Sequence, residues 1–339
     1  MIQIHDLAED DWITEPGFYR LSIDRHHAQP CMSPDEREAF EADGTMPPIT
    51  AVSVTSGVLR RMLEHGPSKV WATHYLNPNR YPEKETEAKI LGRAMAAIVE
   101  GGVEMLHQQF QVLPDHRPAR PTKQQLRALA EGRESQSARR SIAFWSDVDK
   151  DPRAKITEAQ YELLVTMGGA LANDPAAAYC FGGEPEITMA WQDERTGIWC
   201  LSRPDNVRMD STITDYKKVN MQGGPFIPAR CDALIERHGY DMQMAFAAEG
   251  WQRETGNPPS AVGLAFQEDE PPYEVILREI DAEALSIGAF YNRQSLTRFA
   301  ECYAAGHWPG PGDDTGVYQM SDARREAALS EMQTAGVAP

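Results

Sequence analysis

The amino-acid sequence predicts a mixed α/β domain in which a mixed sheet is flanked by helices. Residues 186–219 have the pattern of three short strands joined by turns, and residues 260–280 have the pattern of two more. Segments with apolar residues at helical spacing precede and follow these strands. At 339 residues the chain is long enough to bury a sizeable core. We therefore expect one large domain built around this sheet, or one domain with an appended lobe.

The central segment combines acidic residues with a lysine. Its predicted strands span residues 186–191, 198–205 and 213–219. Gly197 suits the tight turn between the first two strands, and Pro204 falls at the end of the second, where a missing N–H does little harm. Asp215 and Lys217 are two residues apart and share one face of the third strand, whereas Tyr216 points to the other face. The strands can thus bring acids and a lysine together.

These residue types suit a metal site that hydrolyses phosphodiester bonds. Mg²⁺ is usually held by one or two carboxylates together with waters and phosphate oxygens, so we expect Asp205 and Asp215 to bind it. Glu186 on the neighbouring strand and the backbone carbonyl of Tyr216 are further candidate ligands, and Mn²⁺ could substitute for Mg²⁺. Lys217 could orient or help deprotonate the attacking water and offset charge on the phosphate.

Two short motifs in this segment resemble a known signature. Arg203-Pro204-Asp205 followed by Asp215-Tyr216-Lys217 is similar to the bipartite motif of the PD-(D/E)xK nucleases, whose core is restriction-endonuclease-like. Further segments occur in the order found in the phage and prophage exonucleases similar to RecE (exonuclease VIII). They lie at residues 55–63, 91–94, 196–198, 240–243 and 306–309. The resemblance covers roughly residues 13–310 and is strongest from 184 to 250.

The resemblance implies a metal-dependent DNA exonuclease. Such an enzyme would hydrolyse double-stranded DNA ends, processively and from 5′ to 3′, in phage-type homologous recombination or repair. The resemblance also implies a ring-like homo-oligomer and a single-strand annealing protein as partner. Endonucleolytic or RNA-directed cleavage remains open.

The resemblance also assigns roles to residues outside the three strands. Gln243 is a candidate active-site residue, and Tyr240, one turn earlier, shares its helix face. Glu186, Lys217 and Gln243 are accordingly the candidate catalytic residues. In the family, the Ser-rich helix start after residue 52 lies close to DNA.

That helix start contains Ser53 and Ser56, with Arg60 about one turn later. A helix N-terminus with exposed N–H groups binds phosphate readily, so these residues and Tyr240 are candidate DNA contacts. The alternative is a plain capping motif, with Ser53 or Thr55 as the N-cap.

One position departs from the family pattern. The segment beginning at residue 91 ends in His in many relatives, and that histidine contacts the metal site, whereas this chain has Ala96. His107 lies on nearly the same helical face but on the order of 16 Å further along, so it cannot replace the missing group. The alternative function is therefore a catalytically weak or inactive nuclease fold that binds DNA ends or proteins. Retention of Glu186, Asp205, Asp215 and Lys217 together argues against it.

Charge and cysteine content restrict the class of protein further. The net charge of −18 argues against nonspecific wrapping of nucleic acid. Residues 116–140 are nevertheless basic, and they form either a solvated helical face or a DNA-facing surface. The five cysteines form no C-x-x-C pair, so we expect no structural zinc or iron–sulfur cluster. No P-loop follows a strand, so no nucleotide-driven motor is indicated.

The remaining sequence defines the expected domain organisation. We expect an irregular N-terminal arm over residues 1–50, a single nuclease domain over 51–310 with catalytic strands at 184–219, and a polar C-terminal tail over 311–339. The predicted helices span residues 53–71, 85–110, 123–135, 156–179, 229–248 and 281–303, and an exposed connection is expected near 147–153. No apolar run approaches the ~18 residues that span a bilayer, and the first residues lack a signal-peptide pattern. We therefore expect a cytoplasmic protein without membrane contact.

Overall fold

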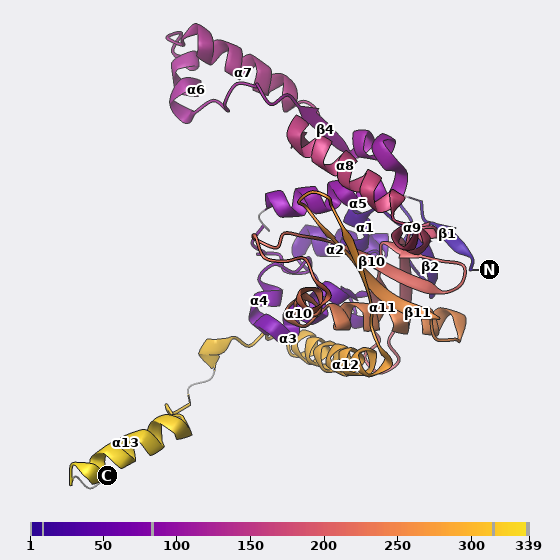
Figure 1. The fold of residues 1–339 in the computed structure, drawn as a ribbon, viewed down its shortest axis with the longest axis vertical. Helices are drawn as coiled ribbons and strands as arrows, with labels where there is room; N and C mark the ends of the chain where they lie inside the picture. The colour runs from indigo at the N-terminus through magenta and orange to yellow at the C-terminus, as the bar shows by residue number, and fades with distance from the viewer. Residues whose placement is uncertain (1, 9, 83–84, 314–315, 337–339) are drawn as a thin grey trace.

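A computed structural model describes residues 2–8, 10–82, 85–313 and 316–336. Its centre consists of two mixed sheets (Figure 1). In order across the first sheet lie β1 (Ile4–Asp6), β2 (Gly17–Arg20), β7 (Ile187–Gln192), β8 (Trp199–Ser202) and β3 (Ser53–Thr55). In order across the second lie β12 (Val275–Glu279), β11 (Ala261–Glu268), β10 (Thr212–Val219), β9 (Asn206–Val207) and β6 (Glu184–Pro185). The predicted α/β class with a mixed sheet is confirmed.

The chain passes between the two sheets at two neighbouring points. At Glu186 it leaves β6 of the second sheet and enters β7 of the first. At residues 203–205 it leaves β8 of the first sheet and enters β9 of the second. The backbone N–H of Glu186 donates to the carbonyl of Asp205 across 3.2 Å, which joins the two crossing points. The predicted strand 198–205 is accordingly shorter in the structure, since β8 ends at Ser202 and β9 begins only at Asn206.

Helices cover both faces of the second sheet. On one face, α11 (Tyr240–Thr255) packs against β10 and β11, and it also contacts β7 and β8 of the first sheet. Around it pack α3 (Ser56–His65), α10 (Pro228–His238) and α12 (Ala282–Ala305). On the other face lie α5 (Glu87–Gln109), α8 (Glu158–Asn173) and α9 (Pro175–Cys180). Side chains of β10 alternate between these layers, as a strand requires.

The alternation along β10 is visible in its contacts. Ile213 belongs to the apolar cluster with α11, whereas Tyr216 belongs to the cluster formed by α5 and α8. The Tyr216 hydroxyl donates to Oε1 of Gln267 at 2.8 Å, and Gln267 in turn donates to the carbonyl of Met167 on α8. Tyr216 therefore points away from the face that carries Asp215, as the sequence predicted.

Several predicted helices are interrupted by glycine. The segment 229–248 divides into α10 and α11 at Gly239, which adopts a left-handed φ of 60°. Helix α5 is broken at Gly101 and Gly102, where φ of Gly102 is 68°. The segment 53–71 contains β3, α3 and then α4 (Pro67–Trp71), so Thr55 rather than Ser53 precedes the helix. Thr55, one of the two predicted residues, is the N-cap, but its side chain makes no capping hydrogen bond.

The N-terminal segment contains regular structure that the sequence did not predict. Strand β2 pairs antiparallel with β7, and α1 (Ile23–His27), α2 (Pro34–Asp43) and η1 (Ile49–Ala51) follow it. The ring of Phe18 on β2 packs 5.6 Å from that of Trp251 on α11. The prediction of irregular structure is thus wrong for these residues. A strand as short as β2 has too little sequence pattern to be predicted, and its pairing with the distant strand β7 defines it. The division of the chain into an N-terminal segment (1–50), a nuclease domain (51–310) and a C-terminal tail (311–339) stays a prediction.

A helical arm projects from the layer of α5 and α8 (Figure 1). Its base is the parallel pair β4 (Phe110–Leu113) and β5 (Ala154–Thr157), and its helices are α6 (Lys123–Ala130) and α7 (Gln136–Val148). Helix α7 was not predicted, since residues 135–147 were not assigned to a helix of their own. Ser135 caps it by accepting from the N–H of Ala138, and its buried side chains recur at helical spacing through Trp145 and Val148.

The chain ends in η2 (Pro311–Asp313) and α13 (Asp322–Thr334). Helix α13 has no buried residue. Within the described ranges, no helix is both long enough and apolar enough to cross a membrane.

Candidate active site

The crossing points between the sheets hold two of the predicted site residues. Glu186 is a non-glycine residue with a left-handed φ of 56°, a strained conformation that surrounding contacts must maintain. Arg203 supplies these contacts, because its Nε donates to the Glu186 carbonyl at 3.0 Å and its guanidinium forms an ion pair with the Glu186 carboxylate. Both side chains are almost entirely buried, with about one-tenth of each exposed.

A second group of residues forms a closed hydrogen-bonded triangle. The Lys217 ammonium forms an ion pair with Oδ2 of Asp215 and donates to Oε1 of Gln243 at 3.2 Å. The Gln243 amide donates to Oδ1 of Asp215 at 3.0 Å. Strand β10 places the first two residues on one face, and α11 crosses that face with Gln243. The structure therefore brings together three residues that lie up to 28 positions apart in the sequence.

Asp205 lies beside this triangle. Its Oδ2 accepts the backbone N–H of Tyr216 at 2.5 Å. In the described part of the chain, its other carboxylate oxygen accepts no hydrogen bond. Burial raises the pKa of Asp205 well above its ordinary value, and the negative charges of Asp215 and Glu186 raise it further. Three carboxylates thus lie close enough to repel one another.

The other ionisable groups respond to the same concentration of negative charge. Burial raises the pKa of Glu186 to about 7, Arg203 opposes this shift, and Glu100 and Asp215 add to it. Burial alone would lower the pKa of Lys217, but the charges of Asp215, Tyr240 and Asp205 and the hydrogen bond to Asp215 together outweigh burial and raise it, so the ammonium stays charged. Coupled carboxylates with raised pKa values are typical of sites that bind a cation or perform catalysis.

The donor set fits a hard divalent cation only in part. Asp205 and Asp215 provide the two carboxylates that Mg²⁺ usually takes from a protein. Glu186 is turned toward Arg203, and among the described residues no three His, Cys, Asp or Glu side chains form a complete ligand group. A cation would therefore have two protein carboxylates, with water and phosphate oxygens completing its shell.

An aromatic ring separates this site from a second cation. The Lys217 ammonium lies 4.4 Å from the centroid of the Tyr240 ring, and the Arg60 guanidinium lies 5.7 Å from it. Arg60 also donates to the carbonyl of His238 at 2.9 Å, while its buried Nε has no partner in the described structure. The structure thus brings Tyr240 and Arg60 to the edge of the triangle. Both cations, Lys217 and Arg60, lie within cation–π range of the Tyr240 ring.

The two serines of the predicted DNA-binding set differ in position. Ser56 is half-buried at the first turn of α3. Ser53 is only 3% exposed and lies on β3, where Gln29 binds both its N–H and its carbonyl. The structure therefore does not bring Ser53 to the surface of the site, because its backbone is part of the sheet.

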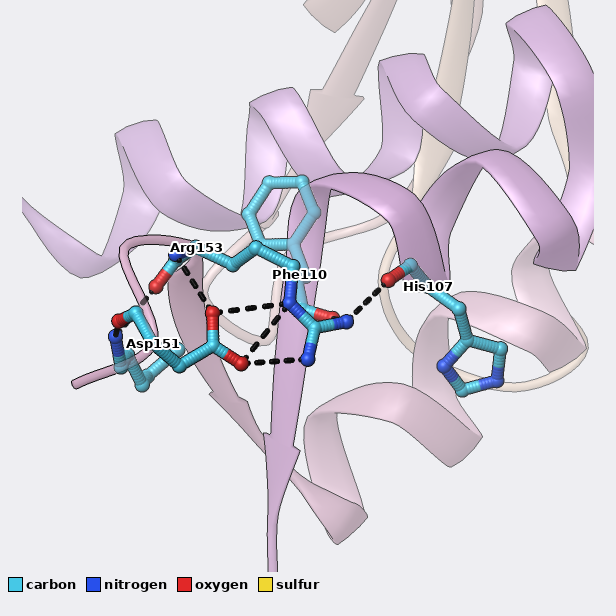
Figure 2. Close-up of polar contacts among 5 residues, drawn as sticks. His107, Phe110, Asp151 and Arg153 are labelled. Carbon is cyan, nitrogen blue, oxygen red and sulfur yellow. Dashed lines mark hydrogen bonds and ion pairs between the residues drawn. The ribbon is translucent and has the colours of Figure 1, made fainter. Parts of the chain in front are cut away.

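Helix α5 approaches the site at a residue that the sequence did not single out. Ala96 lies on α5, and Glu100, one turn later, is close enough for its charge to raise the pKa of Glu186. The sequence offered one signal for Glu100: it lies four residues after Ala96 and therefore on the same helix face. His107 lies elsewhere, since its carbonyl accepts from Arg153 at the base of the helical arm (Figure 2). Its ring packs against that of Tyr161 on α8, with centroids 5.3 Å apart.

Comparison with known proteins identifies the family. Residues 67–318 match the family described as a PDDEXK-like domain of unknown function (DUF3799). The chain belongs to this family. The match covers both halves of the signature at Asp205 and Asp215, so the predicted PD-(D/E)xK character is confirmed.

A solved structure has the same fold as this PDDEXK-like protein. The chain is similar to the crystal structure of a "Putative exonuclease" from Eubacterium rectale, with 11% identity and a TM-score of 0.54, over 91% of this chain and 98% of that one. A phage-related exonuclease from Haemophilus somnus 129PT aligns with 11% identity over 62% of this chain and 94% of that one, at a TM-score of 0.30 that is too low to support an argument. No curated protein matches.

Membership of the PDDEXK-like family places the described site in the context of nucleases. Nucleases of this superfamily generally use divalent metal ions. The paired carboxylates of Asp205 and Asp215 at the sheet junction suit that requirement, and the family match covers Lys217 and Gln243 as well.

Proposed function

We propose that this chain is a metal-dependent nuclease that hydrolyses phosphodiester bonds at the ends of double-stranded DNA. The observation that carries the proposal is the convergence of Asp205 with the triangle of Asp215, Lys217 and Gln243 at the junction of the two sheets. An acidic pair beside a charged lysine suits an attack on phosphate, where negative charge must be accommodated as the reaction proceeds.

Each residue of the site has a proposed role. Asp205 and Asp215 would hold Mg²⁺, or Mn²⁺ in its place, with the carbonyl of Tyr216 as a further ligand, while the Glu186 carboxylate stays paired with Arg203 beside them. Bound there, the ion would polarise the phosphate and lower the pKa of a coordinated water. Gln243 orients the Lys217 ammonium by accepting its hydrogen bond, and Lys217 would position the water and offset charge on the phosphate.

The surroundings of the triangle suggest how DNA would be held. Ser56 at the start of α3 can offer its hydroxyl and N–H to a phosphate. Arg60 can offer the positive charge of its guanidinium, and Tyr240 can offer its ring face. The finer features that the RecE-like resemblance implies belong to the same proposal. These are 5′-to-3′ polarity, a role in phage-type recombination or repair, a homo-oligomer and a single-strand annealing partner.

The test compares linear and circular duplex DNA in the presence of Mg²⁺, Mn²⁺ or EDTA. We expect the wild type to degrade linear DNA with either metal and to be inactive in EDTA. Asp215→Asn and Lys217→Met should each lower the rate on the order of 10²–10³-fold, the loss typical of a removed charge-stabilising group. Lys218→Met is the matched control, because Lys218 pairs with Asp269 outside the triangle. Intact linear DNA under both metals would contradict the proposal, whereas cutting of circles would leave a nuclease that is not an exonuclease.

A second candidate function is a catalytically weak or inactive fold that binds DNA ends or proteins. Ala96 favours it, since many relatives of the RecE type have a metal-contacting histidine at this place. An Ala96→His variant distinguishes the two. A large gain in cleavage rate would show a functional site that lacks one group, and DNA binding with no cleavage in either form would support the binding module.

A further inference from the structure

The arm formed by α6 and α7 carries cations that the site does not use. Residues 116–140 contain seven Arg and Lys against two Glu, in a chain whose net charge is −18. The arm projects from the body, as Figure 1 shows. Its positive charge is therefore separated from the acidic remainder of the molecule, and a polyanion can approach it with less repulsion than it would meet elsewhere.

The seven cations of residues 116–140 fall into two groups. In the first, Arg117 donates to the carbonyl of Pro114 at 3.1 Å. Arg120 forms a bidentate pair with Asp149 at 2.8 and 3.0 Å and lies 4.4 Å from the Trp145 ring, so it supports the fold of the arm. Arg133 and Arg139 form ion pairs with Glu131 and Glu134, respectively.

The second group consists of Lys123, Arg127 and Arg140. All three are exposed and have no hydrogen-bond or ion-pair partner among the residues that the structure describes. Lys123 and Arg127 are four residues apart on α6 and so share one face, while Arg140 lies on the adjoining helix α7. These side chains are available to an external anion.

The arm is fixed by internal contacts. Trp145 donates its indole N–H to the carbonyl of Pro118 at 2.9 Å, and Ser141 donates to the carbonyl of Ala119 at 2.6 Å. Trp145 also packs in a small apolar cluster with Leu113 and Val148. Because these contacts hold α6 and α7 in place, the surface of the helical arm loses less conformational entropy on binding than a mobile segment would.

The base of the arm is joined to α5. Arg153 donates to the carbonyl of His107 on α5 at 2.5 Å, and it also binds both carboxylate oxygens of Asp151, as Figure 2 shows. Hydrogen bonds from Arg153 lower the pKa of Asp151 to about 2, so this pair stays ionised at neutral pH. Strands β4 and β5 pair over their full length beside it. The arm therefore continues from the same helix that brings Glu100 to the candidate site.

We propose that the arm binds the phosphate backbone of double-stranded DNA on the duplex side of the end being cut, through Lys123, Arg127 and Arg140. This inference rests on the proposed nuclease function and names a substrate contact outside the catalytic triangle. The occupant is duplex DNA because the cations are spread over two adjoining helices without acidic partners. Exposed Leu126 and Leu129 on α6 make a protein surface the competing occupant, which the experiment distinguishes.

The experiment measures DNA affinity in EDTA as a function of salt. The probes are a blunt duplex of about 40 base pairs and one of about 10, on the order of 140 and 34 Å long at 3.4 Å per base pair. We expect Lys123→Glu/Arg127→Glu/Arg140→Glu to lower affinity for the long duplex at least about tenfold and to reduce the slope of log affinity against log salt by about 3, since each lost phosphate contact is worth about 0.9. Affinity for the short duplex should change much less.

The matched control is Arg195→Glu/Arg298→Glu/Arg324→Glu, which changes the net charge equally at exposed positions outside the arm. In this control, affinity for the long duplex should stay within about twofold of the wild type. The slope of log affinity against log salt should stay within about one unit of it. Unchanged affinity and slope in the arm variant, with its melting temperature preserved, would overturn the proposal. A change in oligomeric state with unchanged DNA affinity would also overturn it and would assign the arm to protein contact.

Metal-dependent cleavage of the short duplex separates this inference from the function on which it rests. If the wild type binds long DNA through the arm but cuts neither duplex, the nuclease proposal fails and the arm proposal stands. If both proteins cut the short duplex at the same rate while the arm variant binds long DNA as the wild type does, the arm proposal fails alone.

Discussion

Arg203 holds Glu186 by its backbone and by its side chain at the point where the chain crosses between the sheets. Each partner depends on the other, because removing one member of a nearly buried pair leaves the other charge without compensation. The arrangement keeps a carboxylate beside Asp205 in a backbone conformation that only a few residues adopt. Arg203 is therefore a positioning residue for the site.

We expect Arg203→Met to lower the free energy of unfolding by about 3 kcal/mol. In the double variant Arg203→Met/Glu186→Gln, part of the loss should be recovered, since neither charge is then left alone. Urea unfolding measures both. Arg298→Met is the control, because the Arg298–Glu301 pair is more than half exposed and should contribute less than about 1 kcal/mol. Additive losses in the double variant would contradict a coupled pair.

His74 makes stability depend on pH. It is buried between Trp71 and Phe299, and its Nδ1 accepts the N–H of Leu76 at 3.3 Å. Burial lowers its pKa to about 4, below the value of about 6.5 in an unfolded chain. Between these values the unfolded chain binds a proton that the folded chain does not, so stability is complete above pH 6.5 and falls as the pH decreases toward 4.

The expected loss over this pH range is about 3 kcal/mol. His74→Asn retains an acceptor for Leu76 but does not titrate, so its unfolding free energy should fall less over the same range. Parallel denaturation curves for the two proteins at each pH give the difference, in which the contributions of other titrating groups cancel. Identical pH profiles would show that His74 is not the titrating group.

At the scale of elements, the break in α5 determines where the helix continues. Gly102 has φ of 68° and ψ of −157°, a region that is almost restricted to glycine. The break separates the half of α5 that carries Ala96 and Glu100 from the half that leads to the arm. Without the break, the second half of α5 would continue along the axis of the first half, and β4 would begin at a different position.

Two glycine substitutions in this one helix should have opposite effects. Gly102→Ala should destabilise the protein by about 1–3 kcal/mol, because alanine is strained at this φ and ψ. Gly92→Ala should stabilise it by about 0.5–1 kcal/mol, because Gly92 lies in regular helix and an added Cβ meets no atom within 4 Å. Thermal melting of both variants provides the measurement. A stabilising effect at Gly102 would show that the break is not required.

At the scale of the whole molecule, the C-terminal segment is attached at one place. Trp308 stacks on Trp71 with ring centroids 4.7 Å apart and meets Phe299 edge-on at 5.0 Å. The N–H of Ser68 donates to the carbonyl of Pro309 at 3.2 Å. The segment through Pro309 therefore belongs to the packed body, whereas α13 contributes no buried side chain.

Two truncations test this boundary. A chain ending at Asp313 should melt within a degree or so of the full chain, since stability follows burial. A chain ending at Gly306 loses Trp308 and should be destabilised by about 3–5 kcal/mol, the usual effect of removing a large aromatic side chain from a packed site. Equal melting temperatures for the two truncated chains would show that the Trp308 stack is not structural.

Local patterns were sufficient for a large part of this architecture. Two-residue spacing placed Asp215 and Lys217 on one face of β10 and Tyr216 on the other. The helix predicted from residue 281 is α12, and Asp281 caps it by accepting the N–H of Ala284. Patterns of this kind need only neighbours in sequence. Strand β2 and helix α7 were missed because four residues, or one amphipathic face in a charged segment, give too little periodic signal.

The sequence by itself determined the mixed α/β class and the acidic pair with its lysine on short strands, because side-chain direction along a strand follows from its period of two. The tertiary structure alone decided three other features. It paired Glu186 with Arg203, it buried Ser53 in the sheet, and it brought Glu100 rather than His107 toward the site. The first depends on where the chain crosses between the sheets, the second on the pairing of β3 with β8 and on Gln29, and the third on the course of α5. Contacts between segments far apart in the sequence establish all three.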